Sequence, residues 1–181
     1  MSVVRPPFCG FTKQGTLATP ATGTLSVLEW GDNSSHFTKI TVDAMKLIIP
    51  GGAAALQGGK LLYTLPAGNI VVKTSYLKML IDGVAATNDA KTPEVGIGTT
   101  TATAATATLG TTLENILEGG LCLAPDCAGT LPAVGTDTVD LVIKAADAHT
   151  IYLNIADTWA GADTGGLLAT GTVILEWAYL D

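Results

Sequence analysis

Three segments near the C-terminus decide the fold: TVDLVIK (138–144), TIYLNIAD (150–157) and ATGTVILEWAYL (169–180). Apolar and polar side chains alternate in each of them, and this period of two predicts strands that bury one face. The connections AADAH and WAGADTGG consist largely of small and polar residues, as loops between strands do. The last third of the chain therefore predicts three successive β-strands.

The same alternation occurs upstream. The longest apolar-rich run, residues 69–83, is apolar or small on both faces and predicts a central strand, because its β-branched content disfavours a helix. The other candidate strands are TLSVLEW (24–30), HFTKITV (36–42), MKLIIP (45–50), GKLLYTLP (59–66) and EVGIGT (94–99). About eight strands without a βαβ rhythm predict an all-β fold, an antiparallel, jelly-roll-like β-sandwich that forms a single domain over residues 24–181.

Two neighbouring stretches depart from the strand pattern. The Thr/Ala-rich tract TTTATAATATLGT (99–111) is typical of either a low-complexity linker or an extended edge strand. One short helix follows, because Thr111 and Glu114 have the spacing of a capping box. The apolar residues of this helix would share one face, and a glycine pair would end it: Leu113, Ile116, Leu117, Gly119 and Gly120.

Residues 1–23 predict an extended N-terminal arm, because their prolines and glycines disfavour both helices and strands. The arm also carries apolar side chains that need a place to be buried: Val3, Val4, Phe8 and Phe11. It either wraps its own domain or reaches a neighbouring subunit, and both alternatives stay open. These four residues are therefore candidate subunit contacts.

The composition excludes some partners. Charged residues make up only 14% of the chain, where soluble domains have about 25%. Such a surface suits a protein whose exterior is partly covered by neighbours. The net charge is −7 and Arg5 is the single arginine, so nucleic acid and anionic membranes are not expected partners. No segment predicts a membrane span or a signal peptide, and the chain is expected to stay where it is synthesised.

The sequence contains no recognisable catalytic motif. It has neither a nucleophile elbow nor a zinc-protease motif, and too few aromatic residues (6%) for the platforms of a typical sugar-cleaving cleft. Cys122 and Cys127 have no second cysteine pair and lie far in sequence from His36 and His149. We interpret them as ordinary thiols, with an adventitious disulfide as the lesser alternative. We therefore expect no enzyme activity, no cofactor and no metal site.

Trp159 is the remaining candidate contact residue. It stands in a loop of Gly, Ala and Asp between two strong strand segments. It anchors this loop to the core of its own domain, or it is a hot spot at a subunit contact. The first alternative is favoured, since most tryptophans are core residues.

A set of spaced motifs resembles a known family. They are LPAGNIVVKTSYLKMLIDG (65–83), EVGIGT (94–99), TLENILEGG (112–120), AADAHTIYLNIADTWAGADTG (145–165) and ATGTVILEW (169–177). Together they resemble capsid decoration, or cement, proteins of tailed bacteriophages, which have jelly-roll-like β folds. The likeness runs from about residue 60 to residue 180, whereas residues 1–58 match nothing recognisable. It carries no active site.

The resemblance implies a structural virion protein, made in the host cytoplasm and located on the capsid exterior. It implies the major capsid protein as partner, a homotrimer, and clamping of neighbouring capsomers. The acidic, charge-poor surface agrees with an exterior position, and Val3, Val4, Phe8, Phe11 and Trp159 become candidate subunit or capsid contacts. The alternative is a glycan-binding module of a head fibre or tail fibre, which would require exposed aromatic residues beside carboxylates. A secreted lectin-like domain is disfavoured by the missing signal peptide.

Overall fold

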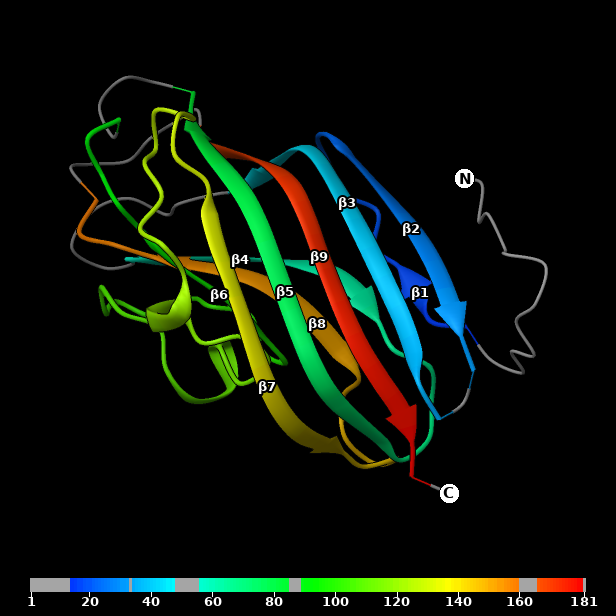
Figure 1. Ribbon diagram of the computed structural model, residues 1–181. Coiled ribbons are helices and arrows are strands. Elements are labelled where there is room, and N and C mark those ends of the chain that lie inside the picture. The colour runs from blue at the N-terminus through cyan, green and yellow to red at the C-terminus, as the bar shows by residue number, and fades with distance from the viewer. Residues whose placement is uncertain (1–13, 33, 48–55, 85–88, 160–165, 181) are drawn as a thin grey trace.

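The computed structural model describes residues 14–32, 34–47, 56–84, 89–159 and 166–180. In these residues nine strands form two antiparallel sheets that pack face to face, and there is no α-helix (Figure 1). The five-stranded sheet lies in front in Figure 1, with β7 at one edge and β2 at the other. The predicted antiparallel β-sandwich is confirmed.

The sheets have the topology of a jelly roll. The larger sheet has the order β2-β3-β9-β5-β7 and the smaller β1-β4-β8-β6. From β3 onward, successive strands alternate between the two sheets, and the last strand lies between β3 and β5. The strands of the larger sheet are β2 (Thr24–Gly31), β3 (His36–Leu47), β5 (Ile70–Gly83), β7 (Ala133–Ile143) and β9 (Leu167–Tyr179). Those of the smaller sheet are β1 (Thr16–Leu17), β4 (Gln57–Thr64), β6 (Glu94–Gly98) and β8 (Thr150–Ala156).

The core lies between the two sheets. Along β9, Val173, Leu175 and Trp177 point inward and are fully buried, whereas the residues between them are partly exposed on the outer face. Leu62 of β4 and Leu153 of β8 belong to the same core from the opposite sheet. The alternation that predicted the strands is thus the alternation between core and surface.

Some strand boundaries differ from those predicted. The segments 36–42 and 45–50 were expected as two strands, but residues 36–47 form one strand with an irregularity between Val42 and Met45, while residues 48–50 lie outside the described residues. The backbone turns at Ala44, whose φ of 49° is unusual for a residue with a side chain. The central position of β5, between β9 and β7, is confirmed.

The prediction of a short helix is wrong. The segment contains two single turns of 3-10 helix, η2 (Thr111–Leu113) and η3 (Gly119–Leu121), and no side chain caps either of them. Glu114 accepts a hydrogen bond from the backbone of Gly119 instead of closing a capping box. The backbone of Leu117 pairs with Ile97 of β6, and this tertiary pairing replaces the helical hydrogen bonds.

The Thr/Ala-rich tract is neither a free linker nor an edge strand. It is a loop that two buried amide side chains of the smaller sheet hold in place. Asn154 donates to the Thr100 carbonyl (2.9 Å) and accepts from the Ala102 N–H (2.9 Å). Gln57 accepts from the Ala104 N–H (3.1 Å) and donates to a carbonyl further along the tract (2.7 Å). These bonds satisfy backbone groups that a loop would otherwise leave to water.

The structure places the end of the predicted arm in the sandwich. β1 pairs with β4, with Thr16 opposite Thr64 and Leu17 opposite Tyr63. This part of residues 1–23 therefore attaches to its own domain. In the described part of the chain, no helix is long and apolar enough to span a membrane.

Candidate interaction surface

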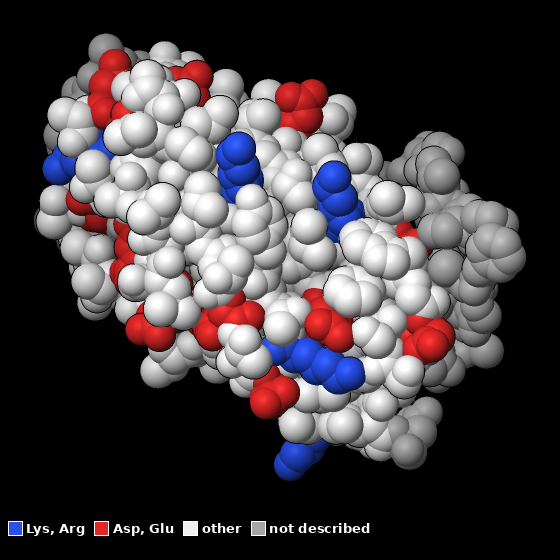
Figure 2. Space-filling model, viewed as in Figure 1, with Lys and Arg blue, Asp and Glu red and all other residues white. Residues whose placement is uncertain are grey.

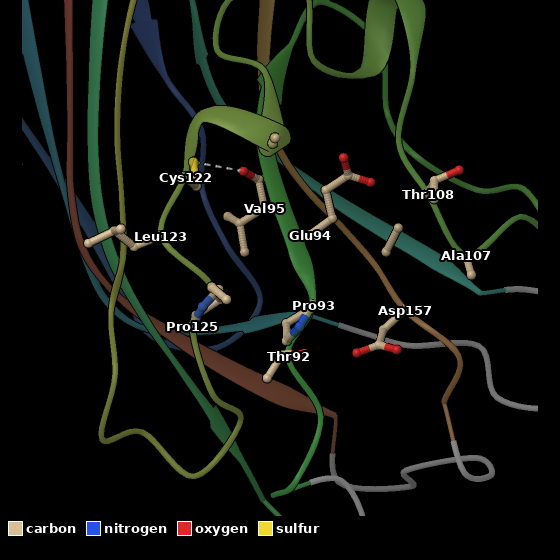
Figure 3. A pocket seen from close by; sticks show the side chains of 14 residues that line it. Thr92, Pro93, Glu94, Val95, Ala107, Thr108, Cys122, Leu123, Pro125 and Asp157 are labelled. Atoms are coloured by element: carbon tan, nitrogen blue, oxygen red, sulfur yellow. Dashed lines mark hydrogen bonds between the residues drawn. The ribbon is translucent and has the colours of Figure 1, made fainter.

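Titratable side chains gather at a crevice of about 340 Å³ between the start of β6, the loop after η3 and the end of β8. Figure 3 shows Glu94 and Pro93 on the β6 side and Cys122, Leu123 and Pro125 on the opposite loop. Glu94 accepts a hydrogen bond from the backbone of Leu109 at 2.6 Å. This carboxylate therefore ties the Thr/Ala-rich loop to β6.

Glu114 has a comparable structural role. Its carboxylate accepts the Gly119 N–H at 2.8 Å. Partial burial raises the pKa of Glu114, and the nearby charges of Glu94 and Glu118 add to the shift. Among the described residues, no group of three or more His, Cys, Asp or Glu side chains could hold a metal ion. The hydrogen bonds of Glu94 and Glu114 hold the neighbouring loops against the smaller sheet.

The Cys122 thiol is unsuited to nucleophilic chemistry. It lies 3.2 Å from the Val95 carbonyl, to which it donates, as the dashed line in Figure 3 marks. Burial raises the pKa of this thiol to about 11, and the charges of Glu114 and Glu94 contribute in the same direction. At neutral pH the thiol is protonated, whereas nucleophiles and metal ligands need the thiolate.

Alkylation of Cys122 by iodoacetamide is therefore expected to be slow at pH 7. Its rate should rise roughly tenfold per pH unit as far as pH 11, because only the thiolate reacts. The measurement is the alkylated fraction of the Cys122 peptide by mass spectrometry, in native and in urea-unfolded protein. A native rate that levels off near pH 8.5 would contradict the raised pKa.

A second group of polar side chains is buried between the sheets. The carboxyl group of Glu29 accepts a short hydrogen bond from the Tyr63 hydroxyl and a longer one from Thr38 (3.4 Å). Its Oε1 lies 3.6 Å from Nε2 of His36, whose ring stacks on Trp177 with the ring centres 4.1 Å apart. Glu29 is only 3% exposed and the other four side chains are at most 1% exposed. This buried cluster is out of reach of a substrate, and its role is structural.

The sequence-predicted contact residues fall into two groups. Val3, Val4, Phe8 and Phe11 lie outside the described residues. Trp159 is 7% exposed, belongs to the core, and donates from Nε1 to the Leu56 carbonyl at 2.8 Å. The structure thus places Trp159 where the favoured alternative put it, and in the isolated chain its ring is not presented to a partner.

The loop GGLCLAPDCAGTLPA (119–133) presents a different set of apolar side chains. Leu121, Leu123 and Leu131 are 49%, 68% and 58% exposed. Alternation of apolar and polar residues did not predict this exposed leucine loop, because these leucines stand in a loop without a period. The available signal was three leucines among Gly, Pro and Asp residues.

Hydrogen bonds hold the exposed leucine loop in one conformation. The Asp126 carboxylate accepts from the backbone of Thr130 (2.8 Å) and of Leu131 (3.0 Å), and also from the Thr130 hydroxyl. These bonds, led by the one from the Thr130 side chain, lower the pKa of Asp126. The backbone of Leu123 bonds to Val134 at 3.0 Å. The leucines are therefore presented by an ordered loop and lose little conformational entropy when a partner covers them.

Comparison of the chain with family models, with curated proteins and with solved structures finds no match. The sandwich of two antiparallel sheets is established by the structure itself. The resemblance to phage decoration proteins remains a prediction from the sequence motifs.

Proposed function

We propose that this chain is a structural virion protein that binds the outer surface of a phage capsid and stabilises it by clamping neighbouring capsomers. The observation that carries the proposal is the exposed leucine loop, which presents an ordered apolar surface. The carboxylates of Glu94 and Glu114 hold loops by hydrogen bonds. The partner is the major capsid protein, and the protein acts as a homotrimer on the capsid exterior after synthesis in the host cytoplasm.

The energetics favour adhesion by several weak contacts. Full burial of one leucine side chain stabilises a complex by about 1.5–3 kcal/mol relative to leaving it exposed. Leu121, Leu123 and Leu131 are about half to two-thirds exposed, so each can contribute only part of this amount. A trimer would present the loop three times, and each further contact would then be effectively intramolecular. Modest single contacts would suffice for stable attachment to a repetitive shell.

The charge distribution supports an exterior position. The net charge of −7 disfavours a surface that faces packaged DNA. Figure 2 shows charged side chains of both signs on the face of the five-stranded sheet, with uncharged surface between them.

Removal of the protein tests the proposal directly. Particles that lack it are expected to burst at lower temperature or milder osmotic shock than complete particles, and the free protein is expected to sediment as a trimer. If particles with and without the protein released DNA at the same temperature, the clamping function would be excluded. If the free protein were a monomer at tens of micromolar, the homotrimer would be excluded.

The double variant Leu123→Ser, Leu131→Ser is expected to bind particles that lack the protein at least tenfold more weakly, because apolar burial worth about 1.4 kcal/mol or more is lost. The measurement is co-sedimentation with particles at increasing protein concentration. The matched control is Val142→Ser, since Val142 is 50% exposed at the opposite end of β7. Equal binding by the double variant and the control would exclude the exposed leucine loop as the attachment surface.

A further inference from the structure

The outer face of the five-stranded sheet carries side chains in two regular rows. The strand register places Trp30, Phe37, Glu176, Thr74 and Thr138 side by side across the sheet. The same register aligns a second row, which consists of Leu28, Lys39, Ile174, Tyr76 and Thr136. Because neighbouring strands are about 4.8 Å apart, side chains within a row contact each other or a common ligand.

A groove of about 450 Å³ lies along these rows. Phe37 stands at one end and Tyr76 within the groove. The remaining lining residues are Thr74, Ser75, Thr136, Asp137, Thr138, Ile174 and Glu176. Of these, the three threonines and Glu176 present polar groups in the two rows, whereas the Ser75 hydroxyl bonds to the Ile116 carbonyl inside the sandwich. An apolar surface with a few well-placed polar groups is the usual composition of a small-molecule binding site.

We propose that this groove binds a neutral oligosaccharide. A pyranose ring has an apolar face of C–H groups and a rim of hydroxyls, so it needs an aromatic surface beside groups that donate and accept hydrogen bonds. The groove provides both, on a rigid sheet and in adjacent positions. The proposal goes beyond attachment to a capsid and uses a surface that contains none of the leucines of the exposed loop.

The aromatic side of the groove is held in place before a ligand arrives. The rings of Trp30 and Phe37 stack with their centres 5.3 Å apart and their planes 7° apart. This cross-strand pair fixes the ring of Phe37 at the end of the groove. Phe37 and Tyr76 are each partly exposed, so a sugar face could cover them and remove apolar surface from water.

Glu176 is held in place in the same way. Its Oε1 accepts from the Ser35 hydroxyl at 2.8 Å and its Oε2 accepts from the Thr74 hydroxyl at 3.1 Å. A carboxylate has about four acceptor positions, so these two bonds orient it and leave acceptor capacity for a ligand. Hydrogen bonds from neutral hydroxyls to a carboxylate are stronger than those between neutral groups.

The groove has no excess of either charge. Glu176 lines it as an anionic group. Lys39 pairs with Ile174 in the second row, and Lys78 lies two residues beyond Tyr76 on the same face of β5. These lysines offset the charge of Glu176, so net charge favours neither an anion nor a basic peptide over a neutral ligand. A neutral polyol can also use the threonine hydroxyls both as donors and as acceptors.

The test is binding of the full chain to an array of immobilised neutral, sialylated and amino-bearing oligosaccharides, followed by titration calorimetry with the bound ones. We expect binding to neutral oligosaccharides, weakened at least tenfold by Tyr76→Ala and by Glu176→Gln. Tyr152→Ala is the matched control, because Tyr152 is a half-buried tyrosine on the smaller sheet. Its binding should equal that of the unchanged protein.

Several results would overturn the proposal. These are the absence of binding to every neutral oligosaccharide, preference for the sialylated or the amino-bearing ones, or equal loss in Tyr76→Ala and Tyr152→Ala. Circular dichroism of each variant separates loss of the groove from loss of the fold. The outcome is independent of the capsid proposal, since the leucine variants leave the groove unchanged.

Discussion

Replacement of Trp177 by alanine is expected to lower the free energy of unfolding by about 4 kcal/mol. The indole is fully buried on β9 between the two sheets. Its Nε1 donates to the Thr38 hydroxyl at 2.9 Å, one face stacks on His36, and Tyr179 packs edge-on at 5.5 Å between ring centres. Alanine would leave a cavity in the core and a buried Thr38 hydroxyl without its donor.

The measurement is urea unfolding followed by circular dichroism. Trp30→Ala is the control, because Trp30 is partly exposed on the outer face, where its ring stacks on Phe37. The control should lose about 1 kcal/mol. Similar losses in the two variants would mean that the core between the sheets does not close around Trp177.

The sequence predicted the sandwich because burial in a two-sheet core imposes a period of two. This holds best for β9, where Val173, Leu175 and Trp177 follow the alternation and are all fully buried. It also holds for β2, where Leu25 and Glu29 are four residues apart and therefore on one face, and both are buried. The pattern alone did not show which group would form a hydrogen bond with the buried carboxyl group of Glu29. The donor is Tyr63, which lies on the other sheet.

The wrong predictions for the short helix and the Thr/Ala-rich tract have one physical cause. The capping-box spacing of Thr111 and Glu114 is a local signal worth about 1 kcal/mol, and a pairing with β6 overrides it. That pairing requires close approach, since a side chain at Gly98 would overlap the backbone of Leu113. The Thr/Ala-rich loop likewise depends on Asn154, which is distant in sequence. Contacts over such separations leave no period in the local sequence.

The candidate surfaces were harder to predict than the core. A leucine in a loop and a leucine in a strand look alike in composition. The exposed positions of Leu123 and Leu131 depend on backbone hydrogen bonds to Val134 and to the Asp126 carboxylate. The groove depends on register, because Phe37, Tyr76 and Glu176 come from three different strands. A glycan-binding site would require exposed aromatics beside carboxylates, and Trp159, which is 7% exposed, is not such a residue.

Glu29→Ala is expected to lower the free energy of unfolding by about 3 kcal/mol. The reason is that Glu29 joins the buried cluster across the two sheets. Tyr63 of β4 donates to it from the smaller sheet, while Thr38 of β3 donates to it within the larger sheet. Burial, followed by the bond to Glu29, raises the pKa of Tyr63 above its usual value, so the hydroxyl keeps its proton and needs an acceptor. Alanine would leave that donor buried without one.

Two further variants test whether the hydrogen bond between Tyr63 and Glu29 carries this effect. Glu29→Gln keeps an acceptor oxygen at nearly the same place and should lose only about 1 kcal/mol. Tyr63→Phe removes the donor, and in a double-mutant cycle with Glu29→Ala the two changes should be coupled by about 1 kcal/mol or more. Equal losses for the alanine and glutamine variants, together with no coupling to Tyr63, would show that the bond between the sheets contributes nothing to stability. The stability of the sandwich would then come from apolar burial alone, although the carboxyl group lies inside it.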